Sequence, residues 1–248
     1  MTYTSGNRIL RFCAVLAAAW AILQGGAFFA QAQGDPKAGQ PADAGTPSTA
    51  PPVADPLPIP AWLGGAPDNA FAAYQRGNYV TAMREAMKRI EADPGDGPAM
   101  TLIGELYAQG LGVRRDTAEA ARWYKLAAER SDRQAIFALG VANLKGEGVP
   151  RDRAGAAALF EQAAAQNHPG ALYNLGVLAI ENDGVTSDLP RAARLFRQSA
   201  ELGYSDAAYA LGLLYRNGTG FDKSDEQAAQ WIGRAAKDDN VPAQVEYA

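Results

Sequence analysis

Cysteine and histidine are almost missing from this 248-residue chain, which has one of each, Cys13 and His168. A single histidine excludes a histidine cluster and the usual zinc sites, which need several nitrogen or sulfur ligands. His168 lies in a turn sequence with proline and glycine. We therefore expect no catalytic residue, no metal site and no cofactor.

Basic residues are neither abundant nor clustered, because 23 lysines and arginines stand against 27 acidic residues. A nucleic-acid-binding domain usually carries a basic patch or stripe, so no nucleic-acid partner is expected. Runs of valine, isoleucine and threonine are also scarce. Because such runs are typical of strands, the composition favours an all-helical protein.

The first 32 residues have the features of an export signal. Arg8 and Arg11 form a basic start, residues 12–23 are apolar, and Ala30-Gln31-Ala32 fits the rule for a cleavage site. Cleavage after Ala32 predicts a periplasmic or secreted protein without a membrane span and without cysteine. The alternative is an uncleaved anchor, although the apolar stretch is shorter than the roughly 20 residues of a spanning helix.

Residues 33–67 form a linker rich in proline, alanine and glycine. Eight prolines occur at positions 36, 41, 47, 51, 52, 56, 58 and 60. Such a segment cannot bury enough apolar surface to offset the entropy lost on ordering. We expect a solvated tether, with a docking segment for a partner as the alternative.

A repeat of 36 residues dominates the rest of the sequence. It is visible in two sets of glycines and one of alanines, at Gly104, Gly140, Gly176 and Gly212, at Gly112, Gly148, Gly184 and Gly220, and at Ala99, Ala135, Ala171 and Ala207. Self-similarity at this period is the signature of a helical repeat protein.

Each repeat is predicted to contain two helices, which we call helix A and helix B. In the first copy helix A extends from about Ala99 to Gln109, and Gly110 ends it because glycine readily adopts a left-handed conformation. Helix B begins after an N-cap residue, which is Asp116, Asp152, Asp188 or Ser224 in the four copies. Bulky residues follow in helix B, including Trp123-Tyr124 and Trp231-Ile232.

These residues resemble the Sel-one-like repeat, a relative of the tetratricopeptide repeat. The resemblance rests on Ala99, Ile103, Gly104, Tyr107, Gly110, Gly112, Val113, Asp116, Ala120, Trp123, Tyr124, Ala127 and Ala128, with departures at Asn182, Phe221 and Ser224 in later copies. It implies an all-α fold, a right-handed α-solenoid of stacked antiparallel helix pairs, with repeats at 99–134, 135–170, 171–206 and 207–242.

Two shorter segments flank these repeats. Residues 68–98 are predicted to form a degenerate helix pair of tetratricopeptide type, with Gly77 at its turn, which serves as an N-terminal cap. Residues 243–248 are in register with the opening of a fifth helix A. We interpret them as the start of a truncated fifth repeat.

The resemblance also implies a binding surface, because helix A lines the concave face of tetratricopeptide-like solenoids. Three rows are expected to face it: Thr101, Phe137, Tyr173 and Tyr209; Glu105, Val141, Val177 and Leu213; and Ala108, Leu144, Ile180 and Arg216. The predicted binding residues are Phe137, Val141, Leu144, Tyr173, Val177, Ile180, Tyr209, Leu213 and Arg216. The alternative is that the first row packs between helices as core.

The function implied by the resemblance is a non-catalytic protein-interaction scaffold of the bacterial envelope. Its partner would be a protein or peptide, and the complex would serve signalling or envelope assembly. One alternative is a cell-wall-directed hydrolase, as suggested for cysteine-rich relatives, although their paired cysteines are absent here. Another is a glycan-binding module that uses Trp123 and Trp231 as stacking platforms. The sequence does not define the oligomeric state.

Overall fold

The computed structural model describes residues 69–181, 188–238 and 240–247. The chain divides after Pro67, and all described residues belong to the unit Asp68–Ala248. The predicted signal sequence, the linker and Asn182 lie outside the described residues. Every regular element within the described ranges is a helix, which confirms the all-α prediction.

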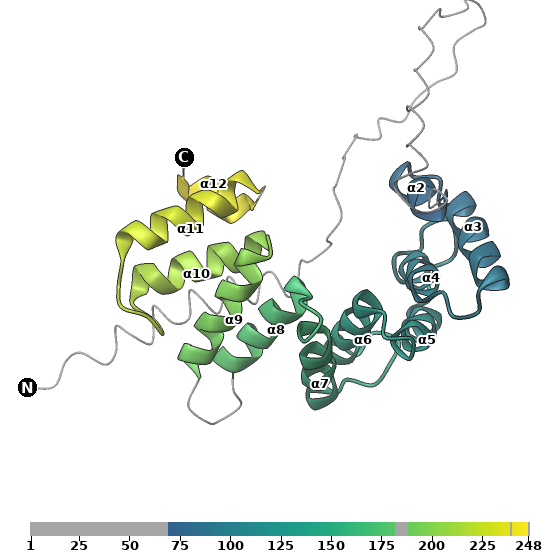
Figure 1. Cartoon of the computed structure of the whole chain (residues 1–248), viewed down its shortest axis with the longest axis horizontal. Helices are drawn as coiled ribbons and strands as arrows, with labels where there is room; N and C mark the ends of the chain where they lie inside the picture. Colours follow the sequence, from purple (N-terminus) through teal and green to yellow (C-terminus); the bar gives the residue numbers. More distant parts are fainter. Residues whose placement is uncertain (1–68, 182–187, 239, 248) are drawn as a thin grey trace, which may run out of the picture. The chain divides into compact units, whose positions relative to one another are not determined.

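The helices follow the two-per-repeat pattern along the chain (Figure 1). Their bounds are α2 Asn69–Gln75, α3 Tyr79–Ala92, α4 Gly97–Gln109, α5 Thr117–Ala128, α6 Arg133–Lys145, α7 Arg153–Ala164, α8 Pro169–Ile180, α9 Leu189–Glu201, α10 Ser205–Asn217, α11 Asp225–Lys237 and α12 Val241–Tyr247. Among these helices, none combines the length and the hydropathy that crossing a bilayer requires.

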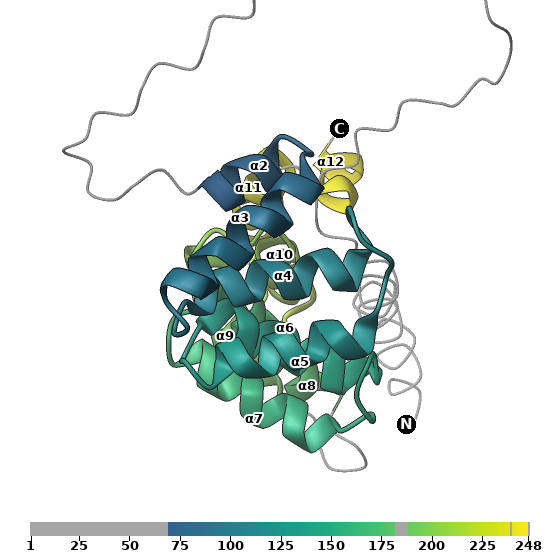
Figure 2. The same ribbon diagram turned by 90° about the vertical axis from the view of Figure 1, so that its right-hand side faces the viewer.

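Helices pack in pairs, and each pair packs on the next. The most extensive contacts lie within α4/α5, α6/α7, α8/α9 and α10/α11, and further contacts join α5 to α6, α7 to α8 and α9 to α10. Figure 2 shows α3, α4 and α5 as successive neighbours in this stack. The arrangement confirms an α-solenoid of stacked helix pairs.

Local signals end and begin the helices where the sequence predicts. Gly110 caps α4 with a φ of 72° in the left-handed region, where a side chain would be strained. The Asp116 side chain accepts hydrogen bonds from the amides of Ala118 and Glu119 at the start of α5. Asp152, Asp188 and Ser224 cap α7, α9 and α11 in the same way. These caps satisfy backbone N–H groups that a helix start leaves without partners.

Helix A approaches helix B closely because a glycine faces a large side chain. A Cβ atom on Gly104 would lie 2.6 Å from Tyr124 Cε1, which is closer than atoms in contact can come. The same holds for Gly140 with Phe160, Gly176 with Phe196 and Gly212 with Ile232. The large side chain of each helix B thus occupies the space that the glycine leaves, and the core lies between the two helices.

Helices α2 and α3 form the additional pair expected before the first repeat. Gly112, in the turn after α4, lies against Tyr79 at the start of α3. One repeat later, Gly148 lies against Thr117 at the start of α5. The turn of repeat one therefore packs on α3 as the turn of repeat two packs on α5, and α2/α3 takes the position of a preceding repeat.

Candidate binding surface

The structure places the predicted binding residues on helix A of repeats two, three and four. They are Phe137, Val141 and Leu144 on α6, Tyr173, Val177 and Ile180 on α8, and Tyr209, Leu213 and Arg216 on α10. The three helices thus carry the same three positions, four and three residues apart, which lie on one face of an α-helix.

Their exposure is smaller than an open apolar groove requires. Leu144, Tyr173, Val177, Ile180, Tyr209 and Leu213 are buried, Phe137 and Val141 are half-buried, and Arg216 is exposed. The three rows therefore do not form a continuous exposed apolar surface, and the binding role of these residues stays a prediction. The surface of these rows consists mainly of Arg216 and parts of Phe137 and Val141.

The first row is buried because its side chains fill the joints between consecutive repeats. The Phe137 ring stacks on His168, with centroids 4.3 Å apart, and lies 5.9 Å from the Phe160 ring. Tyr173 lies 5.4 Å from Phe196 in its own repeat and 5.3 Å from Tyr204 before the next helix A. These contacts agree with the interpretation of the first row as core, and a role of Phe137 and Tyr173 in binding a partner stays a prediction.

The joint between repeats one and two is formed by polar side chains. The Thr101 hydroxyl donates to Asp132 Oδ1 at 2.9 Å and lies 3.0 Å from the Gly97 carbonyl oxygen. The same Asp132 oxygen accepts from the Ala135 amide at 2.8 Å and so caps α6. One carboxylate therefore caps a helix and also holds the preceding repeat.

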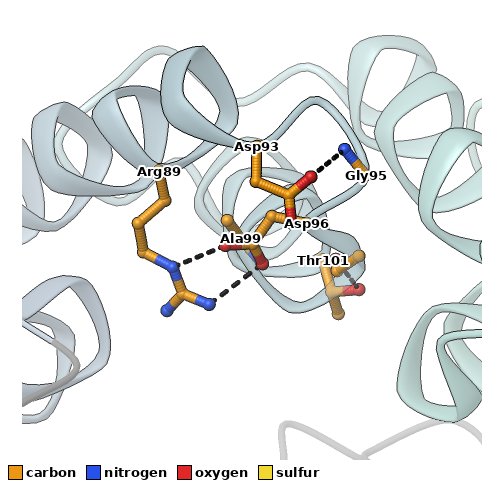
Figure 3. Close-up of polar contacts among 7 residues, drawn as sticks. Arg89, Asp93, Gly95, Asp96, Ala99 and Thr101 are labelled. Carbon is orange, nitrogen blue, oxygen red and sulfur yellow. Dashed lines mark hydrogen bonds and ion pairs between the residues drawn. The ribbon is translucent and has the colours of Figure 1, made fainter. Parts of the chain in front are cut away.

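The cap position of helix A forms a column of structural residues that the sequence interpretation missed. Residues 36 apart occupy it: Asp96, Asp132, His168, Tyr204 and Asn240. All except Tyr204 accept a hydrogen bond from a backbone amide three residues later. Asp96 is also held by Arg89, whose Nε and Nη2 atoms lie 2.7 and 2.9 Å from its two oxygens (Figure 3). The 36-residue spacing of these residues could have identified the column from the sequence.

His168 lies in the turn between α7 and α8, as expected from its sequence, and it also caps α8. Its Nδ1 accepts from the Ala171 amide at 3.2 Å, and its Nε2 lies 2.9 Å from Gln134 Oε1. The side chain is only 8% exposed. Burial, helped by the charge of Arg133, lowers the pKa of His168 to about 4. Both ring nitrogens are engaged, so His168 is poorly placed to act as an acid or base on a substrate.

A buried carboxylate stands at the joint after repeat four. Asp206 Oδ1 accepts from Asn240 Nδ2 at 2.7 Å, and Asn240 caps α12. Burial raises the pKa of Asp206, while the hydrogen bond from Asn240 acts in the opposite direction. The contact matches the one between Gln134 and His168, since both pairs lie 34 residues apart.

The tryptophans are poor platforms for stacking a sugar. Trp123 is half-buried, and it packs against the buried cluster of Met100, Ala127 and Ala135 with its indole nitrogen buried. Trp231 is half-buried, and the Arg234 guanidinium carbon lies 5.5 Å from its ring centroid. A glycan site needs an open aromatic face, so these contacts weigh against that alternative.

Acidic side chains are engaged or dispersed in the part of the chain that the structure describes. Glu181 forms an ion pair with Arg153 at 3.1 Å, while its neighbour Asp183 lies outside the described residues. Within those residues, no three side chains of the kinds that bind metals come together. This arrangement gives no support to a hydrolytic site built on paired carboxylates.

Comparison with known proteins identifies the repeat. The family model described as Sel1 repeat matches residues 97–132, 133–168, 169–204 and 205–240. The matched segments have the predicted length of 36 residues and begin two residues earlier than predicted, directly after the cap column. Comparison with curated protein sequences gives no match.

Solved structures of similar proteins include two at 30% sequence identity. A Sel1 repeat protein from Oxalobacter formigenes has a TM-score of 0.60, with 67% of this chain and 48% of that chain covered. The protective antigen c5321 of uropathogenic Escherichia coli, which displays an SLR fold, has a TM-score of 0.61, with 73% and 39% covered. This chain thus spans less than half the length of either structure.

Proposed function

Because the chain belongs to the Sel1 repeat family, whose members generally act as protein-interaction scaffolds, we propose that it binds a partner protein or peptide along helix A of its repeats. It does so as a non-catalytic adaptor of the bacterial envelope. The complex regulates a signalling or envelope-assembly process. The apolar and basic start of the sequence supports export, with cleavage after Ala32.

The contrast between constant and variable positions of helix A carries this proposal. The glycine that faces helix B is the same in all four repeats, whereas the next residue is Glu105, Val141, Val177 or Leu213. Three residues later the chain has Ala108, Leu144, Ile180 or Arg216. Of these positions, Glu105, Ala108, Val141 and Arg216 remain at least partly exposed, and they differ in charge and size from repeat to repeat. Variable chemistry on one face of a regular scaffold is what recognition of a particular partner requires.

Surface charge at two of these positions offers a direct test. The full chain serves as bait in an envelope extract of the source cells, beside a double variant, Val141→Asp with Arg216→Glu. The matched control is Ala158→Asp with Arg194→Glu, which makes the same charge change at exposed positions of helix B. Circular dichroism establishes that all three proteins keep the same helicity.

We expect the parent and the helix B control to capture the same partner and the helix A variant to lose it, since a buried unpaired charge opposes association. Loss only with the helix B variant would move the binding site to the opposite side of the helix pair. Equal capture by all three proteins would overturn the assignment to helix A.

A further inference from the structure

The joint between repeats two and three contains the only histidine of the chain. The cap column offers an oxygen from Asp96, Asp132 or Asn240 at three of its other positions. None of these oxygens needs to lose a proton near neutral pH in order to accept a hydrogen bond. His168 differs, because an imidazole nitrogen can accept only when it carries no proton.

The contacts of His168 define one protonation state. Since the Ala171 amide donates to Nδ1, this nitrogen carries no hydrogen. The proton of the neutral ring then lies on Nε2, from which it is donated to Gln134 Oε1 on α6. The ring also stacks on Phe137 with an interplanar angle of 20°. The neutral ring thus connects the start of α8 with two residues of the preceding repeat.

A second proton on this ring would break the cap. A proton on Nδ1 would face the Ala171 N–H group, so that two donors would meet at 3.2 Å. The positive end of the α8 dipole also opposes a cation at this place. Of the charged groups that act on the ring, Arg133 on α6 opposes protonation, and Asp132, which precedes α6, favours it. Burial adds to the opposition.

We propose that the joint between repeats two and three is a pH-sensitive hinge, which neutral His168 holds closed and which loosens when the ring gains a proton. The joint between repeats one and two uses Thr101 and Asp132 in the equivalent places and contains no such group. Acid therefore weakens this joint through the His168 ring, which has no counterpart at the first joint. This inference does not depend on the proposed partner.

The direction of the pH effect follows from linkage. The pKa of His168 is lowered from 6.5 to about 4 in the folded protein, so the unfolded chain binds the proton more readily. The stabilisation is fully present above pH 6.5 and is lost as the pH falls towards 4. From these values, the unfolding equilibrium constant rises on the order of 20-fold between pH 7 and pH 5 through this group alone.

The single histidine makes the hinge directly observable by NMR in the full chain. The imidazole nitrogen shifts report the tautomer, and their titration reports the pKa. Exchange of the Ala171 amide, measured relative to the Ala135 amide in the same sample, reports opening of this joint against the neighbouring one. We expect hydrogen on Nε2 at pH 7, a midpoint well below 6, and an exchange ratio that rises at acid pH.

Two variants separate the titration from the packing. His168→Asn and His168→Asp use cap residues that the chain itself has at the same column, at Asn240 and Asp132. We expect both variants to lose the 20-fold dependence between pH 7 and pH 5 and to keep a constant exchange ratio. The raised pKa of Asp206 contributes equally to parent and variants, so the comparison removes it.

Three results would overturn the proposal: a His168 midpoint near 6.5, hydrogen on Nδ1 at pH 7, or the same pH dependence in the parent and in both variants. If one variant folds poorly, the other still provides the comparison. If neither folds, the tautomer and the midpoint of the parent decide.

Discussion

The first two joints of the solenoid connect consecutive repeats through different kinds of contact. Between repeats one and two, the hydroxyl of Thr101 donates to the Asp132 carboxylate. Between repeats two and three, the ring of Phe137 stacks on the imidazole of His168. In each case a helix A residue meets the cap residue of the next helix A, 31 residues further along the chain.

The difference shows which part of a joint the fold requires. Both Asp132 and His168 cap a helix, so the hydrogen bond to the backbone is common to the two joints. The contact to the preceding repeat changes from a hydrogen bond to a ring stack. The cap thus fixes where the next repeat begins, while the filling of the joint can vary and can acquire a pH response.

Removing the ring at the second joint should have the largest effect. Phe137→Ala leaves a gap between His168 and Phe160, and we expect it to lower the free energy of unfolding by about 3 kcal/mol. Urea unfolding followed by circular dichroism measures this change. Phe137→Leu is the control, since it keeps most of the apolar volume. A loss below about 1 kcal/mol would mean that the ring is not part of the joint.

Removing the hydroxyl at the first joint should have a smaller effect. Thr101→Val keeps the shape of the side chain and loses the hydrogen bond to Asp132, for an expected loss of about 1 kcal/mol. The same urea measurement applies, with Thr101→Ser as the control that keeps the hydroxyl. An equal loss in Thr101→Val and Phe137→Ala would abolish the distinction between a polar and an aromatic joint.

An ion pair on the outside of the second joint should contribute least. Arg191 on α9 and Glu161 on α7 lie 3.2 Å apart, and their side chains are 49% and 62% exposed. We expect Arg191→Ala to change the free energy of unfolding by less than about 0.5 kcal/mol, because exposed pairs are hydrated and screened. A loss above 1 kcal/mol that disappears in high salt would show that charge, too, holds this joint.

The repeat period, the helix pairs and the N-caps of helix B could be predicted from the sequence because their signals are local. Gly110 and Asp116 act on residues of their own turn, and such patterns recur in register. The joints could not be predicted in the same way. Thr101 and Asp132 are 31 residues apart, and their hydrogen bond can be identified only once the positions of the two helices are known.

The exposure of the three helix A rows could also not be predicted from the sequence. Val177 and Leu213 have the spacing of a surface row, yet they are 3% and 5% exposed. An apolar side chain at helical spacing gives no indication of which neighbour covers it. His168 lies in the predicted turn, but its role as the cap of α8 was not predicted, because the proline and glycine after it indicated only a turn.

The pairing of each helix A glycine with a large side chain has a consequence for how such arrays change in length over evolution. Gly104 and Tyr124 belong to the same unit, as do Gly176 and Phe196. Gain or loss of a whole unit carries both partners and leaves every other pair intact. A change of one residue more or less inside a helix turns its face by about 100° and sets a larger residue against the ring. A whole unit can therefore be added or removed with its glycine pairing intact, whereas an insertion of one residue within a helix disrupts that pairing.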